Sequence, residues 1–529
     1  MLKLVLGTSG SGKTTLLYAR IRARAEAGKR SILLVPEQFT SSTEARIYRE
    51  LGDALSGMVE SYSFTSLAEH ILAVEGGAAV QTLTDAGRAV LVRRALEELQ
   101  DNVHYYYRHR RSAAFCQMAA ETIDELKSAG LSGQQLQELA RDCGTESAKL
   151  GELALIFQGY ESLLAGTGMD PADRLELAAD RLEAALARDE LPDFLREREV
   201  FIDEFDTFNA PKKRLMGAML AALPAVTVAL CEDGAPMQPG DLELFSGAKQ
   251  VAAQLRQLAR KNGAQVAAPE LLRRDLRHKD APGLAALTEL LETGSCTPPE
   301  SAPELRLFAA ASREEEARCA AAAIRRLMRQ GVRCGKIAVV CRDISLYRAA
   351  VRYEFRMAEI PLYCDEPTTP EFSAPATAVR ALLALLRGAD MTEQLTVLAK
   401  TGLCALTEPE VCALENYAYT WSPNVAAWRA EFTKSPRGFG DAELTEEDTL
   451  NLTRAENARK KLVTAVDTLR SKVRSANAEQ ISRALYFCLK ELGAEGQQAA
   501  QVEDIRTARG IPAAEEAARE WNVVMQLLD

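Results

Sequence analysis

The chain has 529 residues, of which 47% are hydrophobic, 6% aromatic and 26% charged. This length corresponds to about three to four ordinary domains, and the composition excludes a disordered, collagen-like or coiled-coil chain. The 64 basic and 75 acidic residues give a formal net charge of −11, which excludes a bulk polycation, so any nucleic-acid surface must be local. No run approaches the roughly 20 apolar residues of a membrane helix. We therefore expect a cytoplasmic protein that does not interact with membranes.

The first predicted element is a buried strand over residues 3–6, followed directly by a glycine-rich segment. A helix over 14–27 and a second strand over 31–35 come next, which gives a strand–loop–helix–strand unit. The segment matches G-x-x-x-x-G-K-[ST], a pattern whose backbone N–H groups surround phosphate at the start of a helix. It predicts an ATP site, in which Lys13 reaches the β- and γ-phosphates and Thr14 ligates Mg²⁺. The residues expected to bind the nucleotide are Gly7, Thr8, Ser9, Gly10, Ser11, Gly12, Lys13, Thr14 and Thr15.

An acidic pair, Asp203 and Glu204, follows an apolar strand over 200–202. Beside a phosphate loop, Asp203 would hold Mg²⁺ together with Thr14, and Glu204 would polarise the attacking water. By itself the pair is equally consistent with a solvated strand end. Lys13 and Asp203 are 190 positions apart, far more than one crossover needs, so we expect a subdomain inserted between their strands.

The inserted region is predicted to be helical, with helices over 84–99, 115–126, 150–165 and 171–187. Between the first two lies Tyr105-Tyr106-Tyr107-Arg108-His109-Arg110-Arg111, which alternates rings with cations. Such a block could stack bases and pair phosphates of single-stranded DNA, which makes Arg108, Arg110 and Arg111 candidate contacts. A helix flank with solvated arginines explains the same block, and both interpretations remain open at this point.

Further strands are predicted over 225–230, 305–308 and 336–340, the last two around a helix from 312 to 330. From 376 onward the pattern is helical. We therefore predict an α/β fold with two RecA-like P-loop NTPase domains in tandem and large α-helical insertions. The expected domains are a P-loop NTPase domain (1–66 and 196–300), a helical insertion (67–195), a second, incomplete RecA-like domain (301–375) and a truncated helical domain (376–529).

The order of these parts resembles superfamily 1, UvrD-like helicases. Several strings resemble more narrowly the AddB family, the B subunits of AddAB-type bacterial helicase–nucleases, and the resemblance covers essentially the whole chain. The strings are Gly7 to Thr15, Ile32-Leu33-Leu34-Val35-Pro36-Glu37-Gln38, Ser61-Tyr62-Ser63-Phe64-Thr65-Ser66-Leu67-Ala68, Phe201 to Phe208, Lys336 to Arg342, and Ile360-Pro361-Leu362-Tyr363-Cys364-Asp365.

The resemblance implies an ATP- and Mg²⁺-dependent helicase and exonuclease that processes double-strand DNA breaks for recombinational repair. It implies a heterodimer with an AddA-like partner that acts on single- and double-stranded DNA ends. Within the resembling strings, Ser63 and Arg342 become candidate DNA contacts.

The sequence also departs from the family and from a working motor. The family's C-terminal nuclease, held by an iron–sulfur cluster, would lie beyond residue 529, and none of the eleven cysteines is assigned to a cluster. The arginine that stabilises the transferring phosphate would also lie beyond it. No glutamine motif precedes the loop, and Cys231-Glu232-Asp233-Gly234 stands where a motor has Gly-Asp-x-x-Gln. We expect a truncated chain that binds ATP, lacks nuclease activity and does not translocate efficiently alone; whether it hydrolyses ATP stays open.

Two other functions fit parts of the sequence. A P-loop kinase for a small metabolite would explain the glycine-rich segment but gives no role to the chain after residue 303. A non-catalytic scaffold, in which nucleotide binding is structural, is compatible with every motif above.

Overall fold

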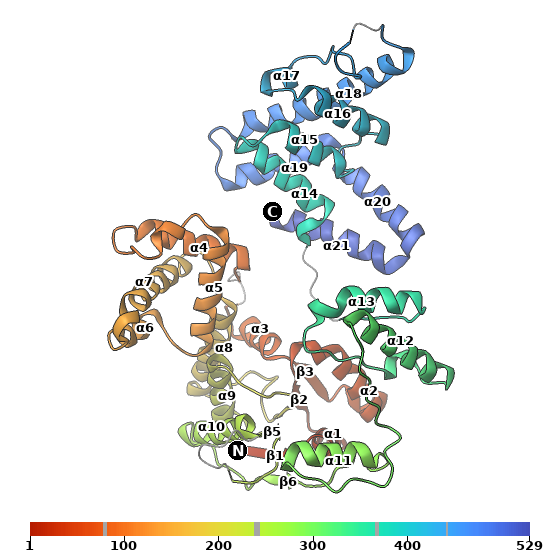
Figure 1. Cartoon of the computed structure of the whole chain (residues 1–529). Helices are drawn as coiled ribbons and strands as arrows, with labels where there is room; N and C mark the ends of the chain where they lie inside the picture. Colours follow the sequence, from red (N-terminus) through yellow and green to blue (C-terminus); the bar gives the residue numbers. More distant parts are fainter. Residues whose placement is uncertain (78–81, 237–243, 365–369, 441–442, 529) are drawn as a thin grey trace. The chain divides into compact units, whose positions relative to one another are not determined.

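The computed structural model describes residues 1–77, 82–236, 244–364, 370–440 and 443–528. Asp365, the last residue of the string Ile360 to Asp365, lies outside these ranges, and so does Asp529, the last residue of the sequence. The chain forms two compact units, Met1–Phe308 and Ala309–Asp529, which are described separately (Figure 1).

The first unit contains a six-stranded sheet in the order β3-β2-β4-β5-β1-β6. Every paired strand is parallel to its neighbour, with Val5 opposite Ala229 and Leu34 opposite Ile202. Because parallel strands are covered on both faces, their sequences are nearly continuous apolar runs. The strands are β1 (Leu2–Gly7), β2 (Ser31–Leu34), β3 (Val59–Tyr62), β4 (Glu199–Ile202), β5 (Ala225–Cys231) and β6 (Glu270–Leu272).

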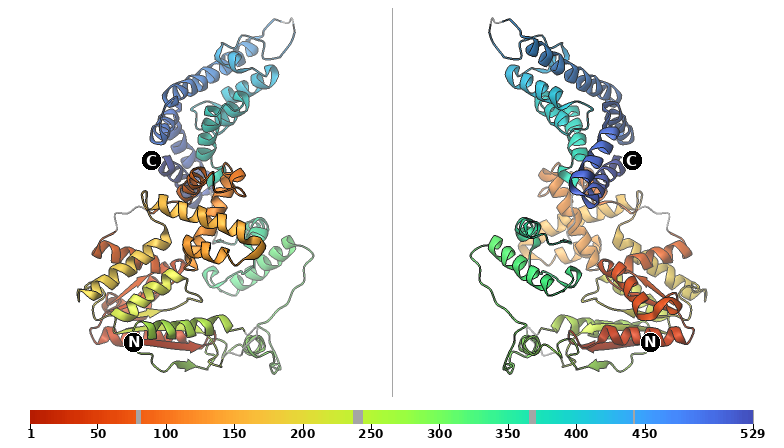
Figure 2. Two further views of the ribbon diagram at one scale, coloured as in Figure 1. Left: turned by 90° about the vertical axis from the view of Figure 1, so that its left-hand side faces the viewer. Right: turned by 90° about the vertical axis from the view of Figure 1, so that its right-hand side faces the viewer.

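Helices cover both faces of this sheet, as two further views show (Figure 2). On one face α1 (Lys13–Glu26) and α2 (Thr40–Ser56) pack on strand residues such as Val5 and Phe201. The other face is covered by α3 (Phe64–Glu75), α8 (Pro171–Ala187), α9 (Ala210–Ala222) and α10 (Ser246–Lys261). Strand β1 lies between β5 and the edge strand β6, and the loop that follows it lies at the carboxyl ends of the strands, where α/β proteins bind ligands. Helix α11 (Pro282–Thr293) lies further along the chain.

Four helices within the region expected as an insertion (67–195) form a core of their own, called the insertion below. It consists of α4 (Asp85–Glu98), α5 (Ala113–Ser128), α6 (Gly133–Ala140) and α7 (Ser147–Leu164). Its buried Tyr160 hydroxyl donates to Asp170 Oδ1 at 2.6 Å, and Lys127 Nζ donates to Asp170 Oδ2 at 2.9 Å. Because Asp170 caps α8, these bonds join the insertion to the helices on the sheet. The helices predicted over 84–99, 115–126, 150–165 and 171–187 are confirmed as α4, α5, α7 and α8, whereas α6 was not predicted.

Helices are the only regular secondary structure in the described residues of the second unit. A pair, α12 (Arg313–Arg329) and α13 (Ile344–Met357), has a small core of its own. The remaining helices share a larger core around Trp428, which is fully buried and donates from Nε1 to Thr392 Oγ1 at 2.9 Å. They are α14 (Ala374–Leu386), α15 (Met391–Lys400), α16 (Glu408–Trp421), α17 (Val425–Arg429), α18 (Glu446–Val473), α19 (Ala478–Leu492), α20 (Ala494–Arg509) and α21 (Ile511–Leu528).

The prediction of strands over 305–308 and 336–340 is wrong. Neither segment pairs with a strand in the described part of the chain, although Ile337 has extended dihedrals of φ −113° and ψ 124°. Leu307 is 98% exposed and Val340 is 90% exposed. An extended apolar run becomes a strand only when neighbouring strands take up its N–H and C=O groups, and here none does. The expected second parallel sheet is therefore not formed by the described residues.

None of the helices within the described ranges is long and apolar enough to cross a bilayer.

Candidate nucleotide site

The glycine-rich loop, residues Gly7 to Thr15, connects the end of β1 to the start of α1. Two of its glycines have left-handed dihedrals, with φ +84° at Gly10 and +91° at Gly12. Gly7 is required for a different reason, because a Cβ there would lie 2.4 Å from Ser11 Oγ and 2.8 Å from Leu272 O. Only glycine fits these positions without strain. The loop thus curves back over the N-terminus of α1.

Lys13 folds over the loop that precedes it. Its Nζ donates to the carbonyl oxygens of Gly7 at 2.7 Å and Thr8 at 2.8 Å. Burial lowers the pKa of Lys13, and the nearby Asp203 carboxylate opposes this shift. A cation held by two neutral carbonyls in a half-buried place is suited to binding an anion, because phosphate oxygens form stronger, charge-assisted bonds.

The acidic pair lies beside the loop. Asp203 follows β4, is 5% exposed, and accepts hydrogen bonds from the Glu204 N–H at 3.0 Å and from the Thr14 hydroxyl. Burial raises the pKa of Asp203, while the bond from Thr14 opposes this shift. Glu204 has φ +66°, a conformation that non-glycine residues rarely adopt and that concentrates at functional sites.

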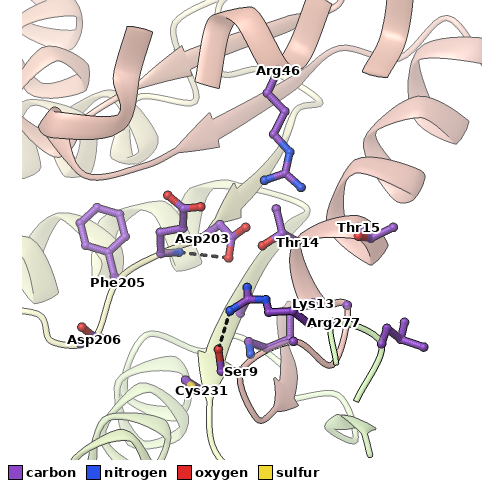
Figure 3. Close-up of a pocket in the computed structure, with 15 residues that line it drawn as sticks. Ser9, Lys13, Thr14, Thr15, Arg46, Asp203, Phe205, Asp206, Cys231 and Arg277 are labelled. Atoms are coloured by element: carbon purple, nitrogen blue, oxygen red, sulfur yellow. Dashed lines mark hydrogen bonds between the residues drawn. The ribbon is translucent and has the colours of Figure 1, made fainter. Parts of the chain in front are cut away.

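These residues line one pocket of about 550 Å³ at the carboxyl edge of the sheet (Figure 3). Eight of the residues predicted for the site line the pocket, namely Ser9, Gly10, Gly12, Lys13, Thr14, Thr15, Asp203 and Glu204. Gly7, Thr8 and Ser11 shape the loop from outside this lining. The Thr8 hydroxyl forms a hydrogen bond with Glu292 of α11, and the buried Ser11 side chain lies next to Gly7.

Thr14 and Asp203 also fit the expected metal. The hydrogen bond between them places one hydroxyl and one carboxylate side by side, the few protein ligands with which Mg²⁺ typically binds next to phosphate oxygens and water. Within the described ranges, no group of three or more His, Cys, Asp or Glu side chains could hold a metal ion by itself. All eleven cysteines are unpaired thiols.

Sequence reasoning missed two arginines of this pocket. Arg46 comes from α2, and Arg277 from the segment after β6. That segment crosses the loop: the Leu276 N–H donates to Gly10 O at 3.0 Å, and Arg277 Nη1 donates to Ser9 Oγ at 3.1 Å. No local pattern marks either arginine, because the fold alone brings them to the loop.

The candidate DNA contacts lie on separate elements. Ser63 is buried and caps α3, where its hydroxyl accepts from the Ser66 N–H. Arg108, Arg110 and Arg111 belong to a surface turn of the insertion, in which the Arg110 guanidinium lies 3.8 Å from the centre of the Tyr107 ring. Arg342 is exposed just before α13 in the second unit.

The fold and the pocket place this chain in the class of parallel α/β proteins with a phosphate-binding loop. In this class the first strand continues into a G-x-x-x-x-G-K-T loop, which lies beside the acidic end of another strand. Residues 4–288 match the family described as ADDB, N-terminal. The chain belongs to this AddB family, in agreement with the resemblance seen in its motifs.

Curated relatives extend the similarity over the whole chain. Two proteins named as the B subunit of an ATP-dependent helicase/deoxyribonuclease, from Desulforudis audaxviator and Moorella thermoacetica, are each 30% identical over 100% of this chain and 47% of their own length. A relative of the same name from Heliobacterium modesticaldum is 28% identical over 100% of this chain and 44% of its own. The chain thus spans about half the length of these relatives.

Proposed function

We propose that this chain is the ATP-binding and DNA-binding portion of an AddB-type subunit in a helicase–nuclease that processes double-strand DNA breaks for recombinational repair. The observation that carries the proposal is the convergence of Lys13, Thr14, Asp203 and Glu204 on one pocket. A chance motif match would give no reason for an acidic strand end 190 residues away to meet the loop.

Each side chain has a defined part in nucleotide binding. Lys13 would exchange its two carbonyl partners for β- and γ-phosphate oxygens, while the loop N–H groups bind the phosphates. Thr14 and Asp203 would hold Mg²⁺, which supplies positive charge against the phosphates. Glu204, beyond Asp203 on the strained turn, would orient the attacking water.

The partners follow from what the relatives are named. The B subunit of a helicase/deoxyribonuclease acts with another subunit and on DNA, which supports an AddA-like partner and DNA ends as ligands of this chain. The proposed DNA contacts lie on the turn of the insertion, where Arg108 and Arg111 are exposed and Arg110 is half-buried over the Tyr107 ring.

The test is ATP binding by the 529-residue chain and its Lys13→Ala variant, measured by calorimetry with Mg²⁺. Removing the phosphate cation should weaken ATP binding about tenfold or more, as expected for charge-assisted bonds. Lys29→Ala, an exposed lysine after α1, is the matched control and should bind normally. Equal affinity of the wild type and the Lys13 variant would refute the nucleotide site.

A second measurement addresses the DNA function. Single-stranded DNA, and not a small phosphate acceptor, should stimulate ATP turnover by this chain together with an AddA-type partner. Stimulation by a small hydroxyl-bearing metabolite instead would identify a kinase and contradict the proposal.

A further inference from the structure

Arg46 enters the pocket from α2, whereas Lys13 enters it from the glycine-rich loop. Figure 3 shows the Arg46 side chain pointing toward Thr14 and Asp203. Its Cζ lies 4.8 Å from the centre of the Tyr18 ring of α1. The buried residues Ile47 and Leu51 hold α2 in the same core as α1, so this direction is set by the packing of the two helices.

Arg46 has unused hydrogen-bonding capacity within the described part of the protein. Its Nε is buried and has no hydrogen-bond partner. A buried donor without an acceptor reduces stability, and such groups in native proteins call for an explanation. The positive charge of Arg46 stabilises the ionised carboxylates of Asp203 and Glu204, but neither carboxylate accepts a hydrogen bond from Arg46 Nε. The planar guanidinium is suited to two parallel bonds to phosphate oxygens.

We propose that Arg46 binds the terminal phosphate of a nucleoside triphosphate, on the side of the pocket that Lys13 does not cover. This inference rests on the proposed nucleotide site. Thr14 and Asp203 are the residues that would hold Mg²⁺, which would there neutralise charge on the β- and γ-phosphates. A guanidinium that points at these two residues therefore faces the γ-phosphate and neither the α-phosphate nor the base. The chain would supply this cation within the same unit as its glycine-rich loop.

A purely structural arginine is the competing explanation, since stacking on Tyr18 stabilises α2 on α1. The two roles differ in one measurable property. Stacking is indifferent to which nucleotide is bound, whereas a contact to the terminal phosphate exists with ATP and is lost with ADP. The ratio of the ATP and ADP affinities therefore separates them.

The experiment measures Mg-ATP and Mg-ADP affinity by calorimetry for the whole 529-residue chain and its Arg46→Met and Arg46→Lys variants. Methionine keeps an apolar stem against Tyr18 and removes the charge. Arg46→Met should weaken ATP binding about tenfold and ADP binding less than about twofold, because only ATP carries the phosphate that Arg46 contacts. Arg46→Lys, which keeps the charge without the fork, should show a smaller loss that is still selective for ATP.

Arg30→Met is the control, because Arg30 is exposed just before β2 and lines neither of the two cavities that Arg46 lines, and it should leave both affinities unchanged. An unchanged ATP-to-ADP ratio in Arg46→Met overturns this inference, and if that variant does not fold, the ratio in Arg46→Lys decides in the same way. If Lys13→Ala loses ATP binding while the Arg46 variant keeps the wild-type ATP-to-ADP ratio, the nucleotide site is supported and only the role of Arg46 is refuted. A wild-type chain that binds no ATP overturns the proposed function and this inference together.

Discussion

The buried carboxylate of Asp203, the proposed metal ligand, favours metal binding but lowers the stability of the fold. The side chain is almost fully buried, and burial raises the pKa of its carboxyl even though Thr14 and the Glu204 N–H stabilise the ionised form. Above that raised pKa, the folded protein holds an anion that the unfolded chain would expose to water, so ionisation lowers the free energy of unfolding. The strained backbone of Glu204 adds to the local cost.

Asp203→Asn should therefore stabilise the fold while removing the proposed metal ligand. We expect the free energy of unfolding at neutral pH to rise by about 1 kcal/mol, because the amide keeps an acceptor oxygen for the Glu204 N–H without the buried charge. The gain should shrink as the pH falls through the raised pKa. It should vanish below about pH 3.9, the value of an unfolded aspartate, where both states are protonated.

Urea unfolding at several pH values would measure this difference. All three tryptophans, at positions 421, 428 and 521, belong to the second unit, so their fluorescence does not follow the first. Far-UV circular dichroism follows the unfolding of both units. The transition seen by circular dichroism but not by tryptophan fluorescence is therefore the unfolding of the first unit, which contains Asp203. Asp193→Asn is the control, because its side chain is 96% exposed. A gain that is independent of pH would contradict the explanation.

At the scale of elements, one carboxylate organises the turn that carries the aromatic and basic block. Glu152 of α7 accepts hydrogen bonds from the backbone N–H groups of His104, Tyr105 and Tyr106 at 2.8 to 3.2 Å. The block is therefore a fixed turn of the insertion that leads directly into α5 and carries exposed arginines, which both interpretations of the block allow. Such bonds to a charged acceptor are worth more than neutral ones.

Glu152→Gln should loosen this turn without unfolding the insertion, because most of the buried core residues belong to the helices α4, α5 and α7. We expect a local loss of about 1 to 2 kcal/mol, because the amide lacks both the charge and one acceptor oxygen. Trypsin cleaves after arginine, so early cleavage at Arg108, Arg110 and Arg111, read by mass spectrometry, should become faster. Glu138→Gln, on the exposed face of α6, should leave these rates unchanged. Equal cleavage in both variants would refute the role of Glu152.

The same elements show what sequence patterns can predict. The strand at 3–6, the helix at 14–27 and the strand at 31–35 are confirmed within about two residues, the usual boundary uncertainty, because hydrophobic period and turn glycines are local signals. The strands at 305–308 and 336–340 were wrong because a strand depends on distant partners. Similarly, Lys13 and Asp203 belong to patterns, whereas Arg46 and Arg277 reach the pocket through tertiary contacts that no local pattern encodes.

At the scale of the whole molecule, the net charge of −11 requires that any DNA path be local. The turn of the insertion offers three arginines within four positions, next to tyrosine rings. Elsewhere on the insertion, by contrast, Arg93 and Arg94 of α4 are paired with Glu97 and Glu98. Cations beside aromatic rings are the arrangement that binds single strands through phosphates and stacking.

Replacing Arg108, Arg110 and Arg111 together by glutamine should weaken single-stranded DNA binding and flatten its dependence on salt. Each phosphate contact to a single strand contributes about 0.7 to the slope of log affinity against log salt, through counterion release. Loss of three contacts should therefore reduce the slope by about two, measured by fluorescence anisotropy over a salt series. The matched double variant Arg93→Gln and Arg94→Gln removes cations that already have acidic partners and should keep the slope. Weaker binding with an unchanged slope would show that the turn contributes through its rings or its fold, and its arginines would then no longer be phosphate contacts.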